Sequence, residues 1–171
     1  GMWETKFVFP SEDLAMHGLK EPELSALVHG SILVQDTRSQ KCYAFLHLSL
    51  QEFCAALYYI LEGLETKHDP FPLFTGNMKS LMELKQIDFS VYLVQVKRFL
   101  FGLVSEGMTG TLEALLGCPV PLVAKQGLLH WISLLGQHAD TITPLDFLDA
   151  FHCLFETQDE ELVHVALTGL Q

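Results

Sequence analysis

The side chains of this chain that could do chemistry are chiefly eight histidines and four cysteines. Zinc sites need Cys or His ligands at short, regular spacing, and His130, His138, His152 and His164 have no partner at such a spacing. His152 and Cys153 are adjacent, which on a helix points their side chains about 100° apart, so they do not form a catalytic Cys–His pair. We therefore predict no catalytic residue and no metal ligand in this sequence.

The sequence also lacks the motif by which many proteins bind the phosphates of ATP. The chain contains no G-x-x-x-x-G-K-[ST] stretch, whose glycines and lysine hold the terminal phosphates of ATP. ATP hydrolysis is therefore not expected, and we predict that the chain is not an enzyme.

The cysteines are far apart and form no CxxC pair, and their neighbours are apolar. Such cysteines are typically small buried residues, so we predict free thiols. An even number of cysteines would also suit a secreted protein with disulfides, but the N-terminus shows no signal peptide. The pair Gly1-Met2 looks like the remainder of a cleaved tag, so we expect an artificial boundary at residue 1. The four cysteines are Cys42, Cys54, Cys118 and Cys153.

The composition indicates a folded piece of a larger assembly. Of the 171 residues, 49% are hydrophobic and 18% are charged. Ordinary globular domains are roughly 25% charged, so part of the apolar surface is expected to contact neighbouring domains. The net charge of -11 would repel a phosphate backbone, which argues against nucleic acid as a partner. The longest apolar run, 91–104, is interrupted by Gln95, Lys97 and Arg98, so we expect no membrane span.

Two short helices are predicted near the N-terminus. Ser11 offers an N-cap hydroxyl ahead of two acidic residues, and Gly18 can end the helix in a left-handed conformation, which predicts a helix over 11–17. Pro22 in a first turn predicts a second helix over 21–29.

Strand-like runs over 32–34 and 43–46 follow, with a polar connection between them, and predict one small hairpin at about 32–47. Helix, helix, hairpin is the order of a winged helix. Directly afterwards, apolar residues recur every three or four positions between Ser49 and Gly63, which predicts the strongest helix of the chain.

The rest of the chain has helical patterns, after a stretch over 65–76 whose prolines and glycine suit a surface loop or domain joint. The predicted fold is therefore mainly α: a partial winged helix with two short helices and a β-hairpin, followed by an all-α helical domain. The helical patterns cover 93–103, 112–116, 123–135, 144–155 and 160–169.

One long stretch resembles a known family of proteins. The run from Tyr43 to Glu62, YAFLHLSLQEFCAALYYILE, resembles the segment that joins the winged-helix and second helical domains in the NACHT, LRR and PYD-containing family of NOD-like receptors. Leu50 and Cys54 depart from that family, which commonly has Phe at both positions. The similarity extends over WETKFVF at 3–9, EDLAMHGL at 12–19, RFLFGLVS at 98–105, LLHWI at 128–132 and FHCLFETQDEEL at 151–162.

The resemblance implies three parts in this chain. They are a winged-helix part over 1–48, a second helical domain (HD2) over 49–155, and a lead-in helix to leucine-rich repeats over 156–171. It implies a regulatory fragment of a cytoplasmic, nucleotide-controlled innate-immune receptor. Such a fragment holds the NACHT ATPase module in its ADP-bound, autoinhibited state, and relays activation to inflammasome-type oligomerisation or immune signalling.

The same resemblance implies the partners of the chain. These are the NACHT and leucine-rich-repeat domains of the same polypeptide and, for the full-length receptor, further copies of itself. ADP or ATP would bind the full-length receptor, and no cofactor is expected in this chain alone.

His47 is the one binding residue that the resemblance implies, because it matches the winged-helix histidine that the family places against the β-phosphate of ADP. Imidazole donates a hydrogen bond to phosphate whether neutral or charged, and a nearby phosphate favours the charged form because the ordinary histidine pKa is about 6.5. From the residues alone, a half-buried histidine bonded to neighbouring backbone is the other interpretation of His47.

Two other functions stay open on the sequence. A helical adaptor could bind a partner through the aromatic-rich helix over 89–101, although such an apolar face is also what a buried core helix shows. A winged helix could bind DNA, but the expected reading helix, 21–29, carries two Glu and neither Lys nor Arg.

Overall fold

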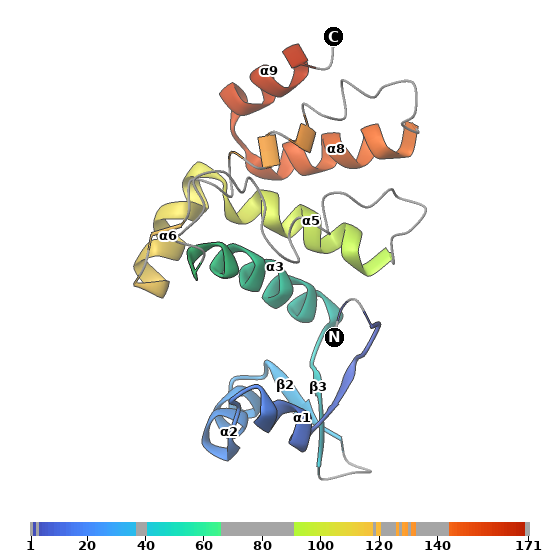
Figure 1. Cartoon of the computed structure of the whole chain (residues 1–171), viewed down its shortest axis with the longest axis vertical. Coiled ribbons are helices and arrows are strands. Elements are labelled where there is room, and N and C mark those ends of the chain that lie inside the picture. The colour runs from blue at the N-terminus through green and yellow to red at the C-terminus, as the bar shows by residue number, and fades with distance from the viewer. Residues whose placement is uncertain are drawn as a thin grey trace. The chain divides into compact units, whose positions relative to one another are not determined.

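The computed structural model describes residues 2, 4–36, 41–65, 91–117, 119–120, 126, 128–129, 131–132 and 144–169. The chain divides into two compact units, Gly1–Cys54 and Ala55–Gln171, which we describe separately. Figure 1 shows the sheet and the first two helices of the N-terminal unit, and the helices of the C-terminal unit. The helix α3, Leu48–Glu65, begins in the first unit and ends in the second.

The N-terminal unit is a winged helix built on a three-stranded antiparallel sheet. Its strands are β1 (Val8–Pro10), β2 (Leu33–Gln35) and β3 (Cys42–Phe45), arranged in the order β1-β3-β2. The helices α1 (Ser11–Met16) and α2 (Glu21–His29) lie between β1 and β2 in the sequence.

The core of this unit lies between the two short helices and one face of the sheet. Leu24 of α2, Leu33 of β2 and Tyr43 of β3 are buried together. Partly buried apolar side chains complete the cluster, so the helices cover this face of the sheet; they are Leu14, Leu19, Leu27, Val28 and Phe45.

The predicted hairpin is confirmed as β2 and β3, but the sequence analysis did not predict β1. Val8 pairs with Ala44 and Pro10 with Cys42, so the strand exists only because a distant segment lies beside it. Three residues are too few to show an alternating pattern.

The termini of the helices follow the sequence in part. Gly18 adopts the left-handed conformation expected after α1, with φ of +84°, and α2 has the predicted bounds.

The prediction of Ser11 as N-cap is wrong: Ser11 is the first helical residue, and its backbone N–H donates to the Lys41 carbonyl at 2.7 Å. The residue that directly precedes β3 therefore accepts from the first N–H of α1, and no side chain caps this helix. The helix α3 also continues past Gly63, which we expected to stop it.

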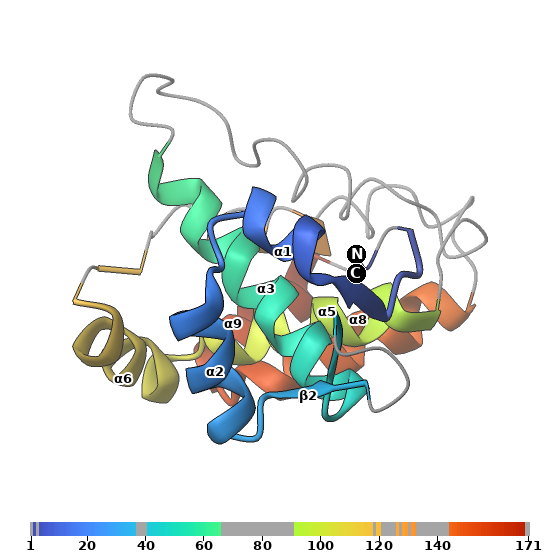
Figure 2. The same cartoon turned by 90° about the horizontal axis from the view of Figure 1, so that it is seen from below.

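The C-terminal unit contains the end of α3 and the helices α5 (Val91–Leu103), α6 (Glu106–Leu116), α8 (Pro144–Thr157) and α9 (Glu160–Gly169). The helices α5 and α8 lie side by side in both views of the molecule (Figures 1 and 2). Their buried side chains form the centre of this unit; they include Leu93, Val96, Leu100, Phe101, Ala150, Cys153 and Leu154.

Several helical predictions are confirmed here. The apolar positions of the predicted helix over 93–103 are buried, so the core interpretation of the aromatic-rich segment is correct. The predicted helix over 112–116 is the end of α6, which begins earlier because Ser105 precedes it in an extended conformation. Asp159 begins α9 by accepting a hydrogen bond from the Leu162 N–H at 2.9 Å.

Some predictions lie outside the described residues. These are residues 66–76 of the predicted loop, Cys118 and most of the helix over 123–135, of which 126, 128–129 and 131–132 are described as helical. Glu65, with which the loop was expected to begin, is the last residue of α3. Within the described residues, no single helix is long and apolar enough to cross a membrane; Tyr92–Leu103 and Glu106–Leu116 reach that length only as a pair bent by 88°.

Candidate functional site

His47 lies at the junction where β3 ends and α3 begins. The backbone N–H of Leu46 donates to the Ile32 carbonyl at 3.0 Å, which continues the pairing of β3 with β2 up to this point. The carbonyl of His47 then accepts from the Leu50 N–H at 3.0 Å, as the first turn of the helix forms. Its side chain is exposed, so the half-buried interpretation is wrong, and the imidazole can reach a ligand or another domain.

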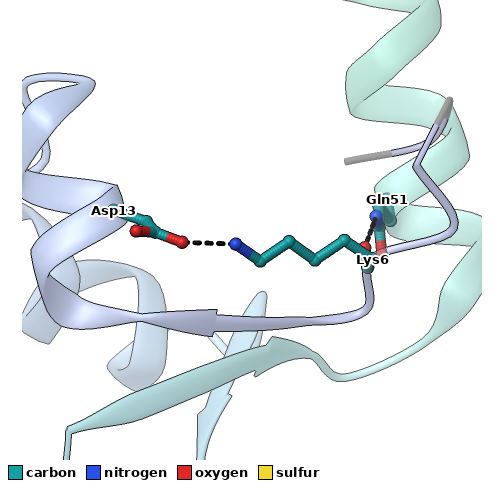
Figure 3. A network of polar contacts seen from close by, with 3 residues as sticks. All are labelled: Lys6, Asp13 and Gln51. Carbon is teal, nitrogen blue, oxygen red and sulfur yellow. Dashed lines mark hydrogen bonds and ion pairs between the residues drawn. The ribbon is translucent and has the colours of Figure 1, made fainter.

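A polar network holds the start of α3 against the segment that precedes β1 (Figure 3). Gln51 lies in the first turn of α3, four residues after His47. Its amide Nε2 is buried and donates to the backbone carbonyl of Lys6 at 2.9 Å. The Lys6 ammonium in turn pairs with the Asp13 carboxylate of α1. This network fixes the local geometry around His47 through residues that lie far apart in the sequence.

The network combines a partly exposed ion pair, Lys6 with Asp13, and the buried amide of Gln51. The hydrogen bond that the Lys6 ammonium donates to the Asp13 carboxylate is the main cause that raises the pKa of Lys6, which keeps the ammonium charged. Both charged side chains are partly exposed, so solvent screens their attraction. Glu52, next to Gln51, is buried, and its loss of solvation raises the pKa of its carboxyl group.

A second polar cluster is buried in the C-terminal unit between α5 and α8. The Nζ atom of Lys97 lies 4.0 Å from Oδ2 of Asp149, and Nε of Arg98 lies 3.6 Å from Oδ1 of the same carboxylate. The Lys97 ammonium also lies 4.7 Å from the centre of the Trp131 ring, a cation–π contact. Burial raises the pKa of Asp149, and the two cations only partly oppose it.

This buried cluster is poorly suited to catalysis. Cys153 follows Asp149 by one helical turn and is completely buried, and burial raises the pKa of its thiol far above the ordinary value. A thiol held in its protonated form is a poor nucleophile and a poor metal ligand. Among the residues that the structure describes, no three His, Cys, Asp or Glu side chains gather into a group that could hold a metal ion.

The cysteines differ in their surroundings. The three described cysteines, Cys42, Cys54 and Cys153, are free thiols. Cys153 is buried as predicted and Cys42 is half-buried, but the prediction of a buried Cys54 is wrong, because it lies on an exposed side of α3. The apolar neighbours of Cys54 in the sequence point in other directions around the helix.

Sequence reasoning found His47 only through the resemblance, and it missed both polar networks. Gln51 and Lys97 stand within apolar helical patterns, where a single polar residue usually marks the solvent side. Their partners are distant in the sequence, so no local spacing indicates the contacts. The interruption of an apolar run by Lys97 and Arg98 was the only signal of the buried cluster.

Comparison with known proteins gives matches over nearly the whole chain. A family model described as NLRC4 helical domain HD2 matches residues 47–165, and one described as NOD2 winged helix domain matches residues 1–45. NACHT, LRR and PYD domains-containing protein 5 of Homo sapiens is 57% identical over 171 residues, which are 100% of this chain and 14% of that protein.

More distant relatives carry similar names. The Mus musculus protein of the same name is 48% identical over 100% of this chain and 15% of its own length. NACHT, LRR and PYD domains-containing protein 3 of Homo sapiens is 33% identical over 98% of this chain and 17% of its own length. The chain therefore spans only 14% to 17% of the length of these relatives.

Proposed function

Because the chain belongs to the NACHT, LRR and PYD domains-containing family of NOD-like receptors, with a winged-helix domain followed by an HD2 domain, we propose that it regulates a NACHT nucleotide module. In this role it holds the module in an ADP-bound, autoinhibited state inside a cytoplasmic innate-immune receptor. Its release then permits oligomerisation or immune signalling by the whole receptor.

The observation that supports this proposal is the position of His47. The side chain is exposed at the β3–α3 junction, inside the long stretch that is similar to the family. A hydrogen bond from this imidazole to an ADP phosphate would form only when the nucleotide module lies against the winged helix. Such a contact, present in one state and absent in the other, is what a ligand needs in order to shift a conformational equilibrium.

The experiment compares ADP affinity in a full-length receptor that carries this chain, with and without His47→Ala. Loss of a hydrogen bond to charged phosphate is expected to weaken ADP binding about tenfold to a hundredfold, from a loss of about 1.5 to 3 kcal/mol. His17→Ala, which removes another exposed histidine of the same unit, is the matched control and should leave the affinity unchanged. Equal ADP affinity in His47→Ala and the unchanged receptor would reject the role of His47.

We also propose that the chain alone does not hydrolyse ATP. The proposal rests on the missing phosphate-binding motif, since His47 is the single residue proposed to contact phosphate. ATP turnover by the purified chain would contradict the proposal, provided that a mock purification without the chain shows no contaminating nucleotidase activity.

A helical adaptor remains the second candidate, because α8 presents an apolar stripe to solvent. Leu148, Phe151 and Phe155 recur every three or four residues along α8 and are all exposed. Such a stripe is what a helix shows when a partner's groove receives it. A protein that binds the isolated chain, and loses binding on Phe155→Ala but not on His47→Ala, would favour this adaptor function.

A further inference from the structure

His47 stands at the corner between β3 and α3, and hydrogen bonds on both sides of it fix its backbone. Before the corner, the Leu46 N–H donates to the Ile32 carbonyl at 3.0 Å, which holds the end of β3 beside β2. After the corner, the Leu50 N–H donates to the carbonyl of His47 itself at 3.0 Å. The direction in which His47 presents its imidazole therefore depends on the angle at which α3 leaves the sheet.

Two contacts close the chain around this corner into a ring. Val8 of β1 pairs with Ala44 of β3, and the side-chain amide of Gln51 in α3 donates to the backbone carbonyl of Lys6. Lys6 precedes Val8 by two residues, so the path from Ala44 through His47 to Gln51 returns to the segment beside which it started. The ring contains His47 and limits the angle between β3 and α3.

The hydrogen bond that closes the ring is protected from water. Gln51 is 5% exposed, and its Nε2 atom lies 2.9 Å from the carbonyl oxygen of Lys6. Because the amide is buried, water is a poor substitute for that carbonyl, and loss of the bond is costly. The amide is also neutral, so salt does not weaken this bond as it weakens the partly exposed pair of Lys6 and Asp13.

The segment to which Gln51 is tied is itself held in place. Figure 3 shows the Lys6 side chain extended toward Asp13 of α1, with which it pairs, while its carbonyl faces Gln51. Two residues further on, Val8 begins the strand that pairs with β3. The carbonyl of Lys6 is therefore a fixed point of the winged helix, and a side chain bound to it transmits that position to the start of α3.

We propose that Gln51 is a positioning residue for the phosphate contact of His47. Its hydrogen bond to Lys6 closes the ring and holds α3 at the angle at which the imidazole meets the nucleotide. The proposal rests on the proposed function for its ligand and deepens it by assigning a second residue, which does not touch ADP itself. A residue in this role affects ADP binding only through His47.

The first measurement follows the backbone of His47 in the isolated chain by NMR relaxation. The order parameter of its amide should be about 0.85, as in rigid backbone, and Gln51→Met should lower it below about 0.6. Methionine resembles glutamine in length and helix propensity but cannot donate a hydrogen bond. Gln158→Met is the matched control, because it removes an amide-to-carbonyl hydrogen bond to Phe155 in α8, and it should leave His47 rigid.

The second measurement is a double-mutant cycle on ADP affinity in the full-length receptor. Gln51→Met should weaken ADP binding about threefold to tenfold when His47 is present, and less than about twofold in the His47→Ala background. A residue that merely supports the fold would weaken binding by the same factor in both backgrounds. Gln51→Glu, whose carboxylate cannot donate, is a second variant that should reproduce the loss, and circular dichroism checks the fold of each variant.

Two results would overturn the proposal: a rigid His47 amide in both Gln51 variants, or equal weakening of ADP binding in the two backgrounds. The outcomes also separate it from the proposed function. Weaker ADP binding in His47→Ala, with no effect of Gln51→Met, keeps the phosphate contact and overturns the positioning role. A mobile His47 amide in Gln51→Met, with unchanged ADP affinity in His47→Ala, rejects the phosphate contact and keeps the hold of Gln51 on the corner.

Discussion

Lys97 and Asp149 form a buried ion pair between α5 and α8: their charged atoms lie 4.0 Å apart, and their side chains are 3% and 4% exposed. Taking both charges out of water costs free energy, and their mutual attraction offsets that cost only while both partners are present. The pair is therefore expected to fix how the two helices pack more than to add net stability.

Removing one partner of this pair should be strongly destabilising at neutral pH. Lys97→Met leaves the Asp149 carboxylate buried with Arg98 as its described cation, at an expected cost of about 3 to 5 kcal/mol in the free energy of unfolding. Urea denaturation of the isolated chain measures this value. Lys6→Met, the same substitution in the partly exposed pair with Asp13, is the control and should change stability much less.

The same variant should show a particular dependence on pH. Burial raises the pKa of Asp149 and Lys97 lowers it, so Lys97→Met should raise that pKa further. A carboxyl group whose folded pKa is raised contributes stability below its unfolded pKa and loses that contribution as pH rises through the folded pKa. The cost of Lys97→Met should therefore be smaller near pH 4 than near pH 7. A cost that grows as the pH falls would show that Lys97 does not act through Asp149.

The core of the C-terminal unit allows a matched pair of phenylalanine substitutions. Phe101 is buried on α5 with its ring 6.0 Å from that of Trp131, whereas Phe155 on α8 is 69% exposed. Phe101→Ala should cost about 3 to 5 kcal/mol because it leaves a cavity. Phe155→Ala should stay within about 0.5 kcal/mol of the unchanged chain, as surface substitutions do. Similar costs for both would mean that α8 is covered in solution.

Substituting alanine for two of the glycines should change the stability of the chain in opposite directions. Gly18 has φ of +84°, so Gly18→Ala forces a left-handed conformation at an expected cost of about 1 to 2 kcal/mol. Gly110 lies inside α6, with open space where a Cβ would stand, so Gly110→Ala should add about 1 kcal/mol of stability. Thermal unfolding of both variants checks the signs.

The thiols should react with iodoacetamide in a fixed order. Among the three cysteines that the structure describes, the exposed Cys54 should react first, the half-buried Cys42 next, and Cys153 only when the chain unfolds. Cys54 is exposed, but its neighbours remove part of its solvation and so raise the pKa of its thiol, as full burial does for Cys153. Alkylation of Cys54 should therefore still accelerate as the pH rises above neutral. Early labelling of Cys153 in folded protein would contradict the packing of α8 on α5.

Local signals in the sequence were enough to predict most of the described helices and the hairpin. They could not predict the features that depend on contacts between residues far apart in the sequence. Proline in the first turn and a clear stop defined α2, and the apolar period defined α3 and α5. The strand β1 depends on Ala44, and the cap of α1 depends on Lys41, so neither has a local pattern. For the candidate site, the residues alone left His47 undecided, and its exposure comes from the position of the β3–α3 junction. From the sequence, Lys97 was only an interruption of an apolar run, because its partner Asp149 is contributed by another helix.

The edges of the winged-helix sheet bear on how the chain behaves at high concentration. Strands β1 and β2 are the two edges, each is three residues long, and β1 ends in Pro10, which has no N–H to donate. Short edges with proline are poor templates for the addition of further strands. Self-association of the isolated chain should therefore proceed through side chains and stay reversible, without the growth of cross-β fibrils that bind thioflavin T.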